Sequence, residues 1–537
     1  MRIGIDFDNT LACYHHVFAE VAPLLELVEP SWRGSKSELR TLLRAREDGE
    51  LKWQELQGQV YGKYIERAKL FTGAANFLLR LKQRSWPVVI VSHKTEFGHY
   101  DADRVPLRQV ALDWMETQRF FGADGFGIQQ QNIHFATTRE EKVQIIAEQE
   151  CDFFIDDLWE VFEELGFPKQ TQRILFSKAR DSENSEYALV CESWREISQF
   201  LLGLESVTEI QYWADYALNS ATDSCKQLAG RGNSRIYQIT HHGADYALKY
   251  YPDLAKDPRE RLKTESSTSE FLLNNGIHNV LVFEGSEPEL SIGWFRWISG
   301  KSIQKIDESL LEQAINFVEE LKELRTNPTA KSLPKAAGAC LSFANLKEQV
   351  DSRFELLEKL QDPYLETFLT TEWQPLYDQS VFDSMDDLSD LPRLYQTLSP
   401  SDFGFHNALE LSDGKIQWLD FEYFGWDDPA KLICDFLWHP GMQLSNELKQ
   451  EWVSQCCRIF GDDPYLKIRL MRDWSLYGLR WTLILLNEFF PQQWEQRMQA
   501  QQLKNDCRRE LQQLQLEKAR AICKLLRKEH LAIPYLN

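Results

Sequence analysis

The N-terminal stretch MRIGIDFDNT, residues 1–10, places three oxygen-bearing side chains directly after a short apolar run. The apolar residues of segment 2–7 predict a short buried strand. Asp6, Asp8 and Thr10 lie at its carboxyl end, where open α/β sheets bind their ligands. Two carboxylates two residues apart can reach one metal ion and one phosphorus centre, but so short an acidic pattern is also common in solvated turns. Whether this stretch forms a functional site or a solvated turn therefore depends on the segments that follow it.

Three later apolar runs repeat the pattern of the first and alternate with helical segments. They lie at residues 87–91, 152–155 and 173–176. Strands that alternate with helices predict an α/β fold with a parallel sheet over about residues 1–200. Between the first two strands, the insertion 13–85 has Leu and Ala at helical spacing. We expect this insertion to form a helical cap above the strand ends.

Polar side chains also follow the later predicted strands. Ser92 follows the second strand, Lys142 opens a helix after the sequence TTREE, and Asp156 and Asp157 follow the third strand. Taken singly, Ser92 suits a strand-capping hydroxyl and Lys142 a surface lysine. Together with the acidic pair near the N-terminus, these residues favour a functional site.

The four segments together resemble the motifs of the haloacid dehalogenase (HAD) superfamily of phosphatases, over about residues 1–200. The resemblance implies a Rossmann-like parallel sheet with an inserted cap, and a Mg²⁺-dependent phosphatase that acts on a small phosphorylated metabolite. It implies that Asp6 is the nucleophile and Asp8 the general acid and base. It assigns the phosphoryl oxygens to Thr10, Ser92 and Lys142, and the metal ion to Asp6, Asp8, Asp156 and Asp157.

From about residue 205 the pattern changes to a helix, hairpin strands and then mostly helix. This order predicts an α+β region with a small sheet lobe at about 205–300 and a large helical lobe at about 301–537. The amphipathic segment 499–528 is expected to be a solvated helix packed on the second lobe. The strands of the sheet lobe are expected at 225–228, 234–240, 245–251, 280–283 and 290–297.

The first hairpin of the sheet lobe contains Gly230 and Gly232, which allow a backbone to approach a ligand closely. A lone G-x-G is ordinary hairpin chemistry. Lys249 on the next strand strengthens the pattern, because its ammonium could reach nucleotide phosphates. Either Glu265 or Glu270 on the following helix could pair with this lysine, and the helix length favours Glu265. Two unpaired surface glutamates are the alternative.

Two acidic segments of the helical lobe form a second constellation. The sequence LSPSDFGFHN contains Asp402 and, five residues later, Asn407. A short hydrophobic strand then ends at Asp420. An Asp, an Asn and a second Asp in this order can accept a hydroxyl proton and hold Mg²⁺ against a nucleotide. Each residue alone is more often found in a turn or a helix cap.

Residues 205–537 resemble the aminoglycoside phosphotransferase and choline kinase family, which shares the bilobal protein-kinase fold. The resemblance implies that Asp402 is the catalytic base, that Asn407 and Asp420 are metal ligands, and that segment 294–300 is the hinge beside the nucleotide base. The family pattern His-Gly-Asp is replaced by Pro-Ser-Asp at 400–402, which puts the support of the catalytic loop in doubt. The resemblance assigns the nucleotide to Gly230, Gly232, Asn233, Ser234, Lys249 and Glu265.

Charge and composition limit the classes of partner. The chain has 60 basic and 82 acidic residues and a net charge of -22, a field that repels nucleic acids. No run approaches the roughly 20 apolar residues of a membrane span, and a strand stands where a signal peptide would need a basic segment. The 10 cysteines show no C-x-x-C spacing, which favours reduced thiols. We expect a cytoplasmic protein with no membrane or nucleic-acid partner, and the pattern predicts no oligomeric state.

Two phosphate-handling sites on one chain suggest a bifunctional enzyme. The hypothesis is a small-molecule phosphatase joined to a kinase that uses ATP or GTP to phosphorylate a sugar-like or otherwise hydroxylated metabolite. In one alternative, the kinase-like region only binds nucleotide and regulates the phosphatase, as the altered loop at 400–402 would allow. Another alternative, processing of nucleic-acid ends, is disfavoured by the negative charge and by the lack of a Walker A sequence.

Overall fold

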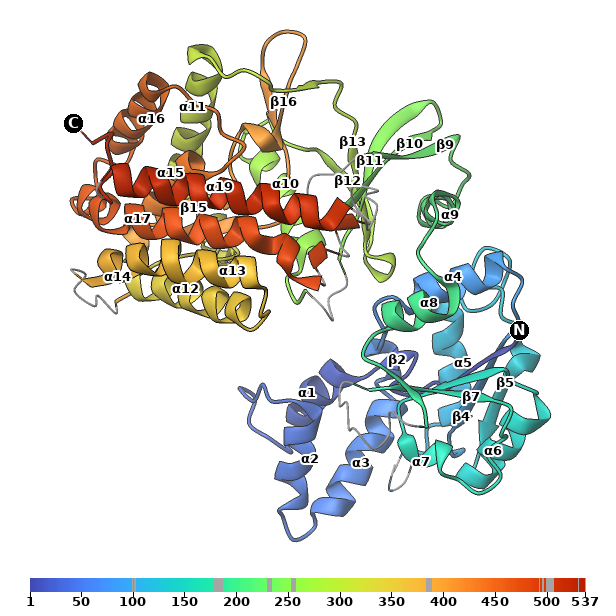
Figure 1. Cartoon of the computed structure of the whole chain (residues 1–537). Coiled ribbons are helices and arrows are strands. Elements are labelled where there is room, and N and C mark those ends of the chain that lie inside the picture. The colour runs from blue at the N-terminus through green and yellow to red at the C-terminus, as the bar shows by residue number, and fades with distance from the viewer. Residues whose placement is uncertain are drawn as a thin grey trace.

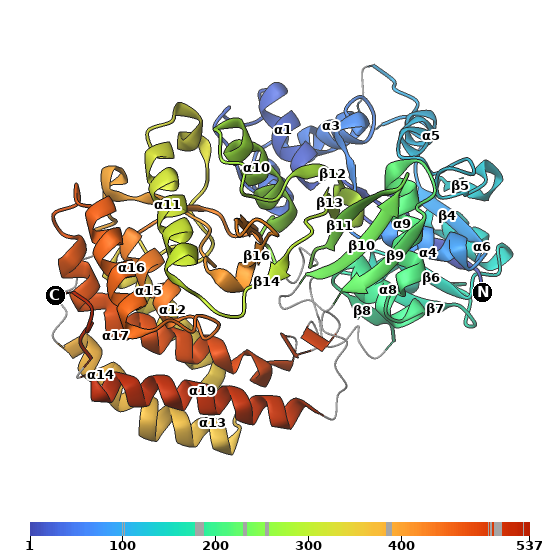
Figure 2. The same ribbon diagram turned by 90° about the horizontal axis from the view of Figure 1, so that it is seen from above.

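A computed structural model shows an N-terminal α/β region, residues 1–202, followed by a region with two lobes (Figure 1). The N-lobe, residues 207–302, is dominated by a sheet, and the C-lobe, residues 308–536, is mostly helical. In the second view the N-lobe sheet lies between the N-terminal region and the C-lobe helices (Figure 2). The structure describes residues 1–98, 100, 103–177, 187–228, 234–252, 257–382, 389–491, 493–494, 497–498, 507–529 and 531–536.

The N-terminal region contains the predicted parallel sheet, with six strands in the order β5-β4-β1-β6-β7-β8. Chain order reverses at β1, so its carboxyl end is the position at which such sheets bind ligands. The edge strands β5 and β8 were not predicted, because they are short and half-buried. The strands are β1 (Ile3–Ile5), β4 (Val88–His93), β5 (Ile133–Ala136), β6 (Phe153–Asp156), β7 (Gln172–Phe176) and β8 (Leu189–Cys191).

Helices cover both faces of this sheet, which explains why its central strands are continuously apolar. Along β4, Val88 and Ile90 belong to one hydrophobic cluster, whereas Val89 and Val91 belong to another. The polar Ser92 follows only where the strand reaches the site. The helices are α4 (Ala74–Gln83), α5 (Leu107–Thr117), α6 (Arg139–Glu148), α7 (Trp159–Phe162) and α8 (Trp194–Leu202).

The cap consists of three helices inserted after β1. The helices are α1 (His15–Leu24), α2 (Lys36–Arg44) and α3 (Gly49–Tyr61). The antiparallel pair β2 (Ala12–Cys13) and β3 (Lys69–Leu70) closes the base of this insertion. The last part of the insertion expected at 13–85 differs from the expectation, since α4 packs against α8 and the N-lobe rather than within the cap. Its mostly apolar face, which resembled that of a cap helix, is buried together with Arg80.

The N-lobe contains a five-stranded antiparallel sheet in the order β12-β13-β11-β10-β9. The strand expected at 280–283 is wrong in position, because β12 starts at Phe283 and continues through a β-bulge. Val280 instead forms an isolated bridge with Trp418 of the C-lobe, which explains its apolar character. The elements are α9 (Val207–Leu218), β9 (Ser224–Leu228), β10 (Arg235–His241), β11 (Ala244–Tyr250), α10 (Arg261–Asn274), β12 (Phe283–Glu287), β13 (Ile292–Arg296) and β14 (Lys301–Ser302).

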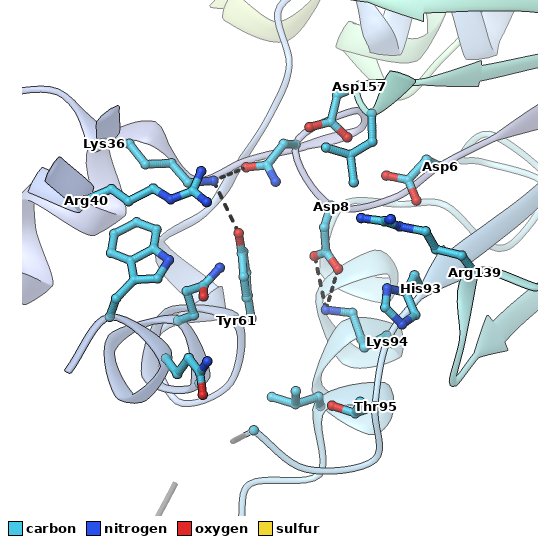
Figure 3. A pocket seen from close by; sticks show the side chains of 18 of the residues that line it. Asp6, Asp8, Lys36, Arg40, Tyr61, His93, Lys94, Thr95, Arg139 and Asp157 are labelled. Atoms are coloured by element: carbon cyan, nitrogen blue, oxygen red, sulfur yellow. Dashed lines mark hydrogen bonds and ion pairs between the residues drawn. The ribbon is translucent and has the colours of Figure 1, made fainter. Parts of the chain in front are cut away.

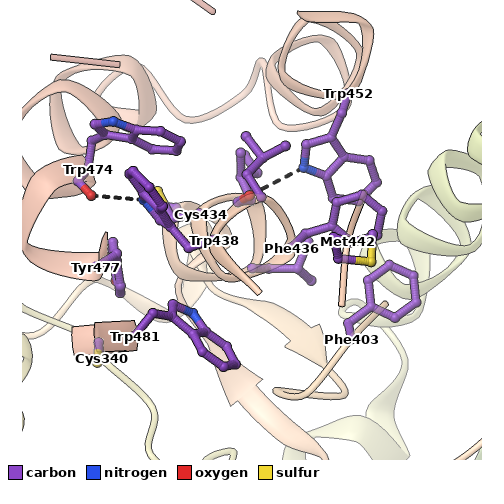
Figure 4. Close-up of a cluster of buried hydrophobic side chains, with 14 of the residues drawn as sticks. Cys340, Phe403, Cys434, Phe436, Trp438, Met442, Trp452, Trp474, Tyr477 and Trp481 are labelled. Atoms are coloured by element: carbon purple, nitrogen blue, oxygen red, sulfur yellow. Dashed lines mark hydrogen bonds between the residues drawn. The ribbon is translucent and has the colours of Figure 1, made fainter. Parts of the chain in front are cut away.

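The C-lobe has one continuous hydrophobic core rich in aromatic side chains (Figure 4). Phe436 stacks on Trp452 with ring centroids 3.8 Å apart, and the Trp438 indole N–H donates to the Trp474 carbonyl. Within the predicted amphipathic segment 499–528, the described helix α19 packs on α17. The helices are α11 (Glu308–Leu324), α12 (Phe343–Glu358), α13 (Pro363–Phe368), α14 (Gln374–Phe382), α15 (Pro429–Trp438), α16 (Asn446–Ile459), α17 (Leu466–Leu485) and α19 (Arg508–Lys528).

Short strands carry the polar segments of the C-lobe toward the N-lobe. They form two small sheets, one of which also includes β14 of the N-lobe. The strands are β15 (Thr397–Ser399), β16 (Ala408–Glu410), β17 (Ile416–Trp418) and β18 (Gly425–Asp427). Among the helices within the described residues, none is both long and apolar enough to cross a membrane.

The N-terminal region and the N-lobe share a hydrophobic core and a buried polar contact. Trp213 and Tyr237 of the N-lobe belong to the same cluster of buried side chains as Ile3 of β1. The Arg80 guanidinium, fully buried on α4, pairs with Glu209 of α9 at 2.9 Å and donates to the carbonyl groups of residues 202–204. The chain is therefore fixed at the passage from one region to the next.

Candidate active sites

Three carboxylates meet at the carboxyl ends of β1 and β6. The two strands are paired, with Ile5 opposite Ile155, so the residues that follow them are neighbours. Carboxylate oxygens of Asp6, Asp156 and Asp157 all lie within 4.8 Å of one another. The structure thus brings together three of the four residues that were assigned to the first metal site.

Lys142 neutralises part of this charge from the second turn of α6. Its ammonium lies 2.6 Å from Asp6 Oδ1 and 2.7 Å from Asp156 Oδ2, and its side chain is only 1% exposed. Burial opposes the charge on this lysine, but Asp156 and Asp6 together raise its pKa above the usual value. Lys142 therefore remains protonated between the two carboxylates.

The carboxyl group of Asp8 is held by other partners. The Tyr14 hydroxyl donates to Asp8 Oδ1 at 2.8 Å, and the Lys94 ammonium lies 2.8 Å from Asp8 Oδ2. Asp8 is not part of the group formed by the three other carboxylates. Sequence reasoning missed Lys94, although its position two residues after Ser92 was a usable signal. Asp8 therefore lines the cavity but lies apart from the three clustered carboxylates.

Two hydroxyl groups complete the first site. The Thr10 hydroxyl lies 3.2 Å from Asp6 Oδ2 and 3.4 Å from Asp157 Oδ1, so it donates to the carboxylates of the site. Ser92 Oγ is buried at the end of β4, and it has no hydrogen-bond partner within the described part of the chain. An unsatisfied buried hydroxyl at this position fits a bound oxygen ligand.

A cavity of about 660 Å³ lies between these strand ends and the cap (Figure 3). Asp6, Asp8, Asp157 and Lys142 line its floor, while α2 and α3 of the cap form the opposite wall. Its volume is typical of pockets for small organic ligands. The cap therefore leaves room for a metabolite above the carboxylates.

The three clustered carboxylates have the character of a site for a hard divalent cation. Burial and the neighbouring carboxylates raise the pKa of Asp6 to about 7, against the opposing effect of Lys142. Burial, followed by the charges of Asp6 and Asp156, raises the pKa of Asp157 to about 8. One lysine does not balance three acids, and oxygen ligands of this kind suit Mg²⁺. The residues present thus fit the predicted metal ion.

The second site is built around Lys249 on β11. Its ammonium lies 2.6 Å from Glu265 Oε1 and 2.9 Å from Asp420 Oδ1, so it joins the N-lobe to the C-lobe. The Tyr251 hydroxyl donates to the other oxygen of Glu265 at 2.7 Å. Glu265, rather than Glu270, is therefore the partner of the lysine, as the helix length favoured.

Asp402 and Asn407 lie together at the start of the C-lobe hairpin. The Asn407 amide donates to the Asp402 carbonyl at 2.9 Å and to its carboxylate at 3.3 Å. The Leu419 N–H donates to the Asn407 carbonyl at 2.9 Å, which places Asp420 beside this loop. The Asp402 side chain is 35% exposed and carries a pKa lowered, against the effect of burial, by His406 and Asn407. Asp402 is thus a partly exposed carboxylate that His406 and Asn407 keep ionised.

Sequence reasoning missed two residues of the second site, Glu422 and His406. Glu422, two positions after Asp420, lies within 4.8 Å of Glu265 and Asp420 and pairs with Arg261. His406 lies 3.1 Å from Asp402 and stacks on His439. The spacing of Asp420 and Glu422 repeats that of Asp6 and Asp8, which was a signal that could have identified Glu422.

The structure describes only part of the predicted nucleotide-binding loop. Gly230, Gly232 and Asn233 lie outside the described residues. Ser234 donates to Glu422 at 3.2 Å, so its hydroxyl supports the acidic group of the second site. Segment 294–300, expected as the hinge, contains the end of β13 and the connection to β14.

The unusual Pro-Ser-Asp loop has an anchor of its own. Ser401 has a left-handed backbone, with φ 66°, and its hydroxyl donates to the Ala337 carbonyl at 2.9 Å. The buried Lys431 ammonium donates to the same hydroxyl at 3.1 Å and pairs with Asp427 and Asp435. The loop that carries Asp402 is therefore fixed although it lacks the His-Gly sequence.

Comparisons with known proteins find distant likenesses among solved structures. No family model and no curated protein sequence matches the chain. Choline kinase LicA from Streptococcus pneumoniae is 13% identical, with a TM-score of 0.37 over 57% of this chain and 94% of that chain. Spectinomycin phosphotransferase APH(9)-Ia, in complex with ADP and spectinomycin, is 14% identical, with a TM-score of 0.41 over 59% and 98%. Plasmodium vivax ethanolamine kinase is 14% identical, with a TM-score of 0.37 over 59% and 94%.

Proposed function

We propose that the chain is a bifunctional enzyme, in which a Mg²⁺-dependent phosphatase for small phosphate monoesters is joined to a nucleotide-dependent small-molecule kinase. The observation that carries this proposal is shared by both sites. In each, a buried lysine bridges two carboxylates, and a further carboxylate lies nearby: Asp8, which lines the same cavity, in the first site, and Asp402, on the loop beside Asp420, in the second. A fixed cation with an available proton acceptor is suited to phosphoryl transfer.

In the phosphatase reaction, the Asp6 carboxylate attacks the phosphorus atom and the ester P–O bond breaks. The carboxyl group of Asp8, as the general acid, gives a proton to the leaving oxygen, and the phosphoryl group remains on Asp6. Water then attacks phosphorus, Asp8 takes up a proton from that water, and the bond to Asp6 breaks to release inorganic phosphate. Lys142 and the Ser92 hydroxyl are placed to hold phosphoryl oxygens, and Lys94 with Tyr14 orients Asp8.

In the kinase reaction, Asp402 accepts the proton of an acceptor hydroxyl as its oxygen attacks the terminal phosphorus of the nucleotide. The bond between that phosphorus and the bridging oxygen breaks, and the nucleoside diphosphate leaves. Lys249, fixed by Glu265, is placed to contact the nucleotide phosphates. His406 and Asn407 hold the Asp402 carboxylate in position.

Each site has residues that would hold Mg²⁺. In the first site these are Asp6, Asp156 and Asp157, and in the second Asn407 and Asp420. The metal ion would neutralise the negative charge that gathers on the phosphoryl oxygens during transfer. The open carboxylate of Asp420, 29% exposed, has room for such a contact.

Crossed variants of the full chain test the proposal. Asp6→Asn is expected to lower phosphate release from a panel of phosphate monoesters by about 1,000-fold or more, and to leave transfer from ATP or GTP to hydroxylated amines and sugars unchanged. Asp402→Asn should give the opposite result. Asp152→Asn and Asp413→Asn, which replace exposed carboxylates on the same two regions, serve as controls.

Two outcomes would overturn parts of this assignment. If Asp402→Asn retains nucleotide-dependent transfer, Asp402 is not the base of a kinase. If the protein binds nucleotide and alters phosphate release without any transfer, the second region is a regulatory nucleotide-binding unit. Chelation of divalent cations should abolish both activities, and added Mg²⁺ should restore them.

A further inference from the structure

The cap wall of the first cavity carries a row of basic side chains. Lys36, Arg40 and Arg44 are spaced four residues apart on α2, so they lie on one face of that helix. All three line the cavity. In the close-up view, Lys36 and Arg40 lie on the opposite side of the cavity from Asp6 (Figure 3). The cavity thus has a row of basic side chains on the cap, opposite the carboxylates of its floor.

The three cations of α2 are not equally engaged. The Lys36 ammonium donates to Asn9 Oδ1 at 3.0 Å and to the Tyr61 hydroxyl at 3.3 Å. Arg44 pairs with Glu50 at 2.5 Å. Among the described residues, none forms a hydrogen bond or an ion pair with Arg40. Its guanidinium is therefore available to a ligand in the cavity.

The reacting phosphoryl group does not need these cations. Lys142 contacts Asp6 directly, and Lys94 contacts Asp8, so both ammonium groups lie on the floor of the cavity. The cations of α2 project from the cap instead. A guanidinium binds phosphate and carboxylate groups through paired, charge-assisted hydrogen bonds.

The wall between the two charged ends suits an organic body. Trp53 and Tyr61 provide aromatic surface, and Gln54 and Gln57 provide amide groups that donate and accept hydrogen bonds. These residues all come from α3, which packs beside α2. The cavity therefore has charged side chains on its floor, aromatic and amide side chains on its wall, and basic side chains on the cap.

We infer that the substrate of the first site is a phosphate monoester with a second anionic group, which Arg40 binds from the cap. The second group is a phosphate or a carboxylate, and Lys36 and Arg44 add positive charge beside it. This inference rests on the proposed phosphatase function of the same site. It narrows the substrate class from any small phosphate monoester to compounds with two separated anionic ends.

The test uses matched pairs of substrates with the full-length protein and Mg²⁺. 3-Phosphoglycerate is compared with glycerol 3-phosphate, and fructose 1,6-bisphosphate with fructose 6-phosphate. For the wild type, kcat/KM is expected to be at least about tenfold higher for one of the compounds with a second anion. The two pairs distinguish a carboxylate from a second phosphate as the preferred group.

The variant Arg40→Gln is expected to lower that preference ratio about tenfold, mainly by raising KM, since it removes a charge-assisted contact to the second anionic group. Arg46→Gln is the matched control, because Arg46 follows α2 but does not line the cavity. It should leave the ratio unchanged. A wild type with no preference in either pair, or an Arg40→Gln variant with an unchanged ratio, would overturn the inference.

Failure of the proposed function is distinguishable from failure of the inference. If no phosphate monoester is hydrolysed, the phosphatase assignment fails. The binding of 3-phosphoglycerate and fructose 1,6-bisphosphate is then measured by calorimetry. Binding that Arg40→Gln weakens about tenfold, and Arg46→Gln does not, would still support a site for two anionic groups. Undetectable binding, or binding that is insensitive to Arg40→Gln, would contradict it.

Discussion

The two sites place a lysine between two carboxylates in the same way, but they differ in how deeply that arrangement is buried. Lys142 is 1% exposed, and its partners Asp6 and Asp156 are buried as well. Lys249 is 8% exposed, and its partner Asp420 is 29% exposed. The same charge pattern is therefore more deeply buried in the first site than in the second.

The difference follows from where the partners lie in the chain. The residues of the first site all come from one sheet and the helix beside it, and they close around the lysine as that sheet folds. In the second site, Lys249 and Glu265 belong to the N-lobe, whereas Asp420 belongs to the C-lobe. The first lysine is thus a part of the folded core, and the second is a link between two lobes.

The largest expected effect is the loss of the buried cation in the first site. Lys142→Met should lower the free energy of unfolding of the N-terminal region by about 3–5 kcal/mol, because it leaves two buried carboxylates without their counter-charge. Calorimetry of the full chain measures this loss. Lys52→Met removes an exposed lysine paired with Glu55 and should leave stability unchanged within the error of the measurement. Equal effects of the two variants would contradict the distinction.

Arg80 extends the comparison to a buried cation between the two regions. Arg80→Met should cost about 2–4 kcal/mol, since several carbonyl groups and Glu209 lose a fully buried donor. Arg84→Met is the matched control, because Arg84 pairs with the same Glu209 but is 32% exposed. We expect less than about 1 kcal/mol for the control in the same thermal unfolding measurement. A larger loss for Arg84 would show that exposure does not set the size of these effects.

Lys249→Met should have a smaller effect on stability than Lys142→Met, at about 1–3 kcal/mol. Glu265 keeps the hydrogen bond from Tyr251, and Asp420 can be solvated. The same variant is expected to reduce nucleotide-dependent transfer by at least about 100-fold, because the phosphates lose a cation. Transfer assays and calorimetry on one preparation measure both quantities. A stability loss as large as that of Lys142→Met would remove the difference between the sites.

The smallest expected effect on stability comes from Glu289, a carboxylate with no ion-pair partner among the described residues. Burial, and then the neighbouring Glu287, raise the pKa of Glu289 to about 7. No ion pair among the described residues includes Glu289, which lies in the turn 288–290 beside α4. Its ionisation in the folded chain therefore costs stability as the pH rises from about 4.5 to about 7.

Glu289→Gln should stabilise the protein above pH 7 by about 1–2 kcal/mol, and this gain should vanish below about pH 4.5. Unfolding by urea at a series of pH values measures the difference between variant and wild type. A gain that is constant across the series would indicate that repacking, and not the charge of Glu289, is responsible.

The sequence predicted those site residues that are linked to a strong local pattern. Asp6 and Asp156 could be placed together because each follows an apolar strand, and parallel strands end at one edge of a sheet. Lys94 and His406 were missed, because a single lysine or histidine in a polar loop has no periodic signal. Whether Asp8 would join the metal-site carboxylates could not be read from its spacing, since Tyr14 and Lys94 hold it elsewhere.

The prediction of the fold was likewise limited to segments with a strong local pattern. The central strands were predicted from continuous apolar runs, but the edge strands β5 and β8 were not, because their half-polar residues match those of loops. Val280 was expected in a strand, since a buried residue of a loop has the same apolar character. Likewise, α4 has the apolar face of a cap helix but is covered by α8 and the N-lobe.

By itself, the sequence determined the central strands and the acidic residues Asp6 and Asp156 that follow them, because these features depend on neighbours along the chain. Only the tertiary structure decided that Asp156 pairs with Lys142 and Asp420 with Lys249, how exposed each pair is, and that Arg40 faces the first cavity from the cap. Charge interactions and solvation depend on distances between segments that lie far apart in the chain, and folding alone sets those distances.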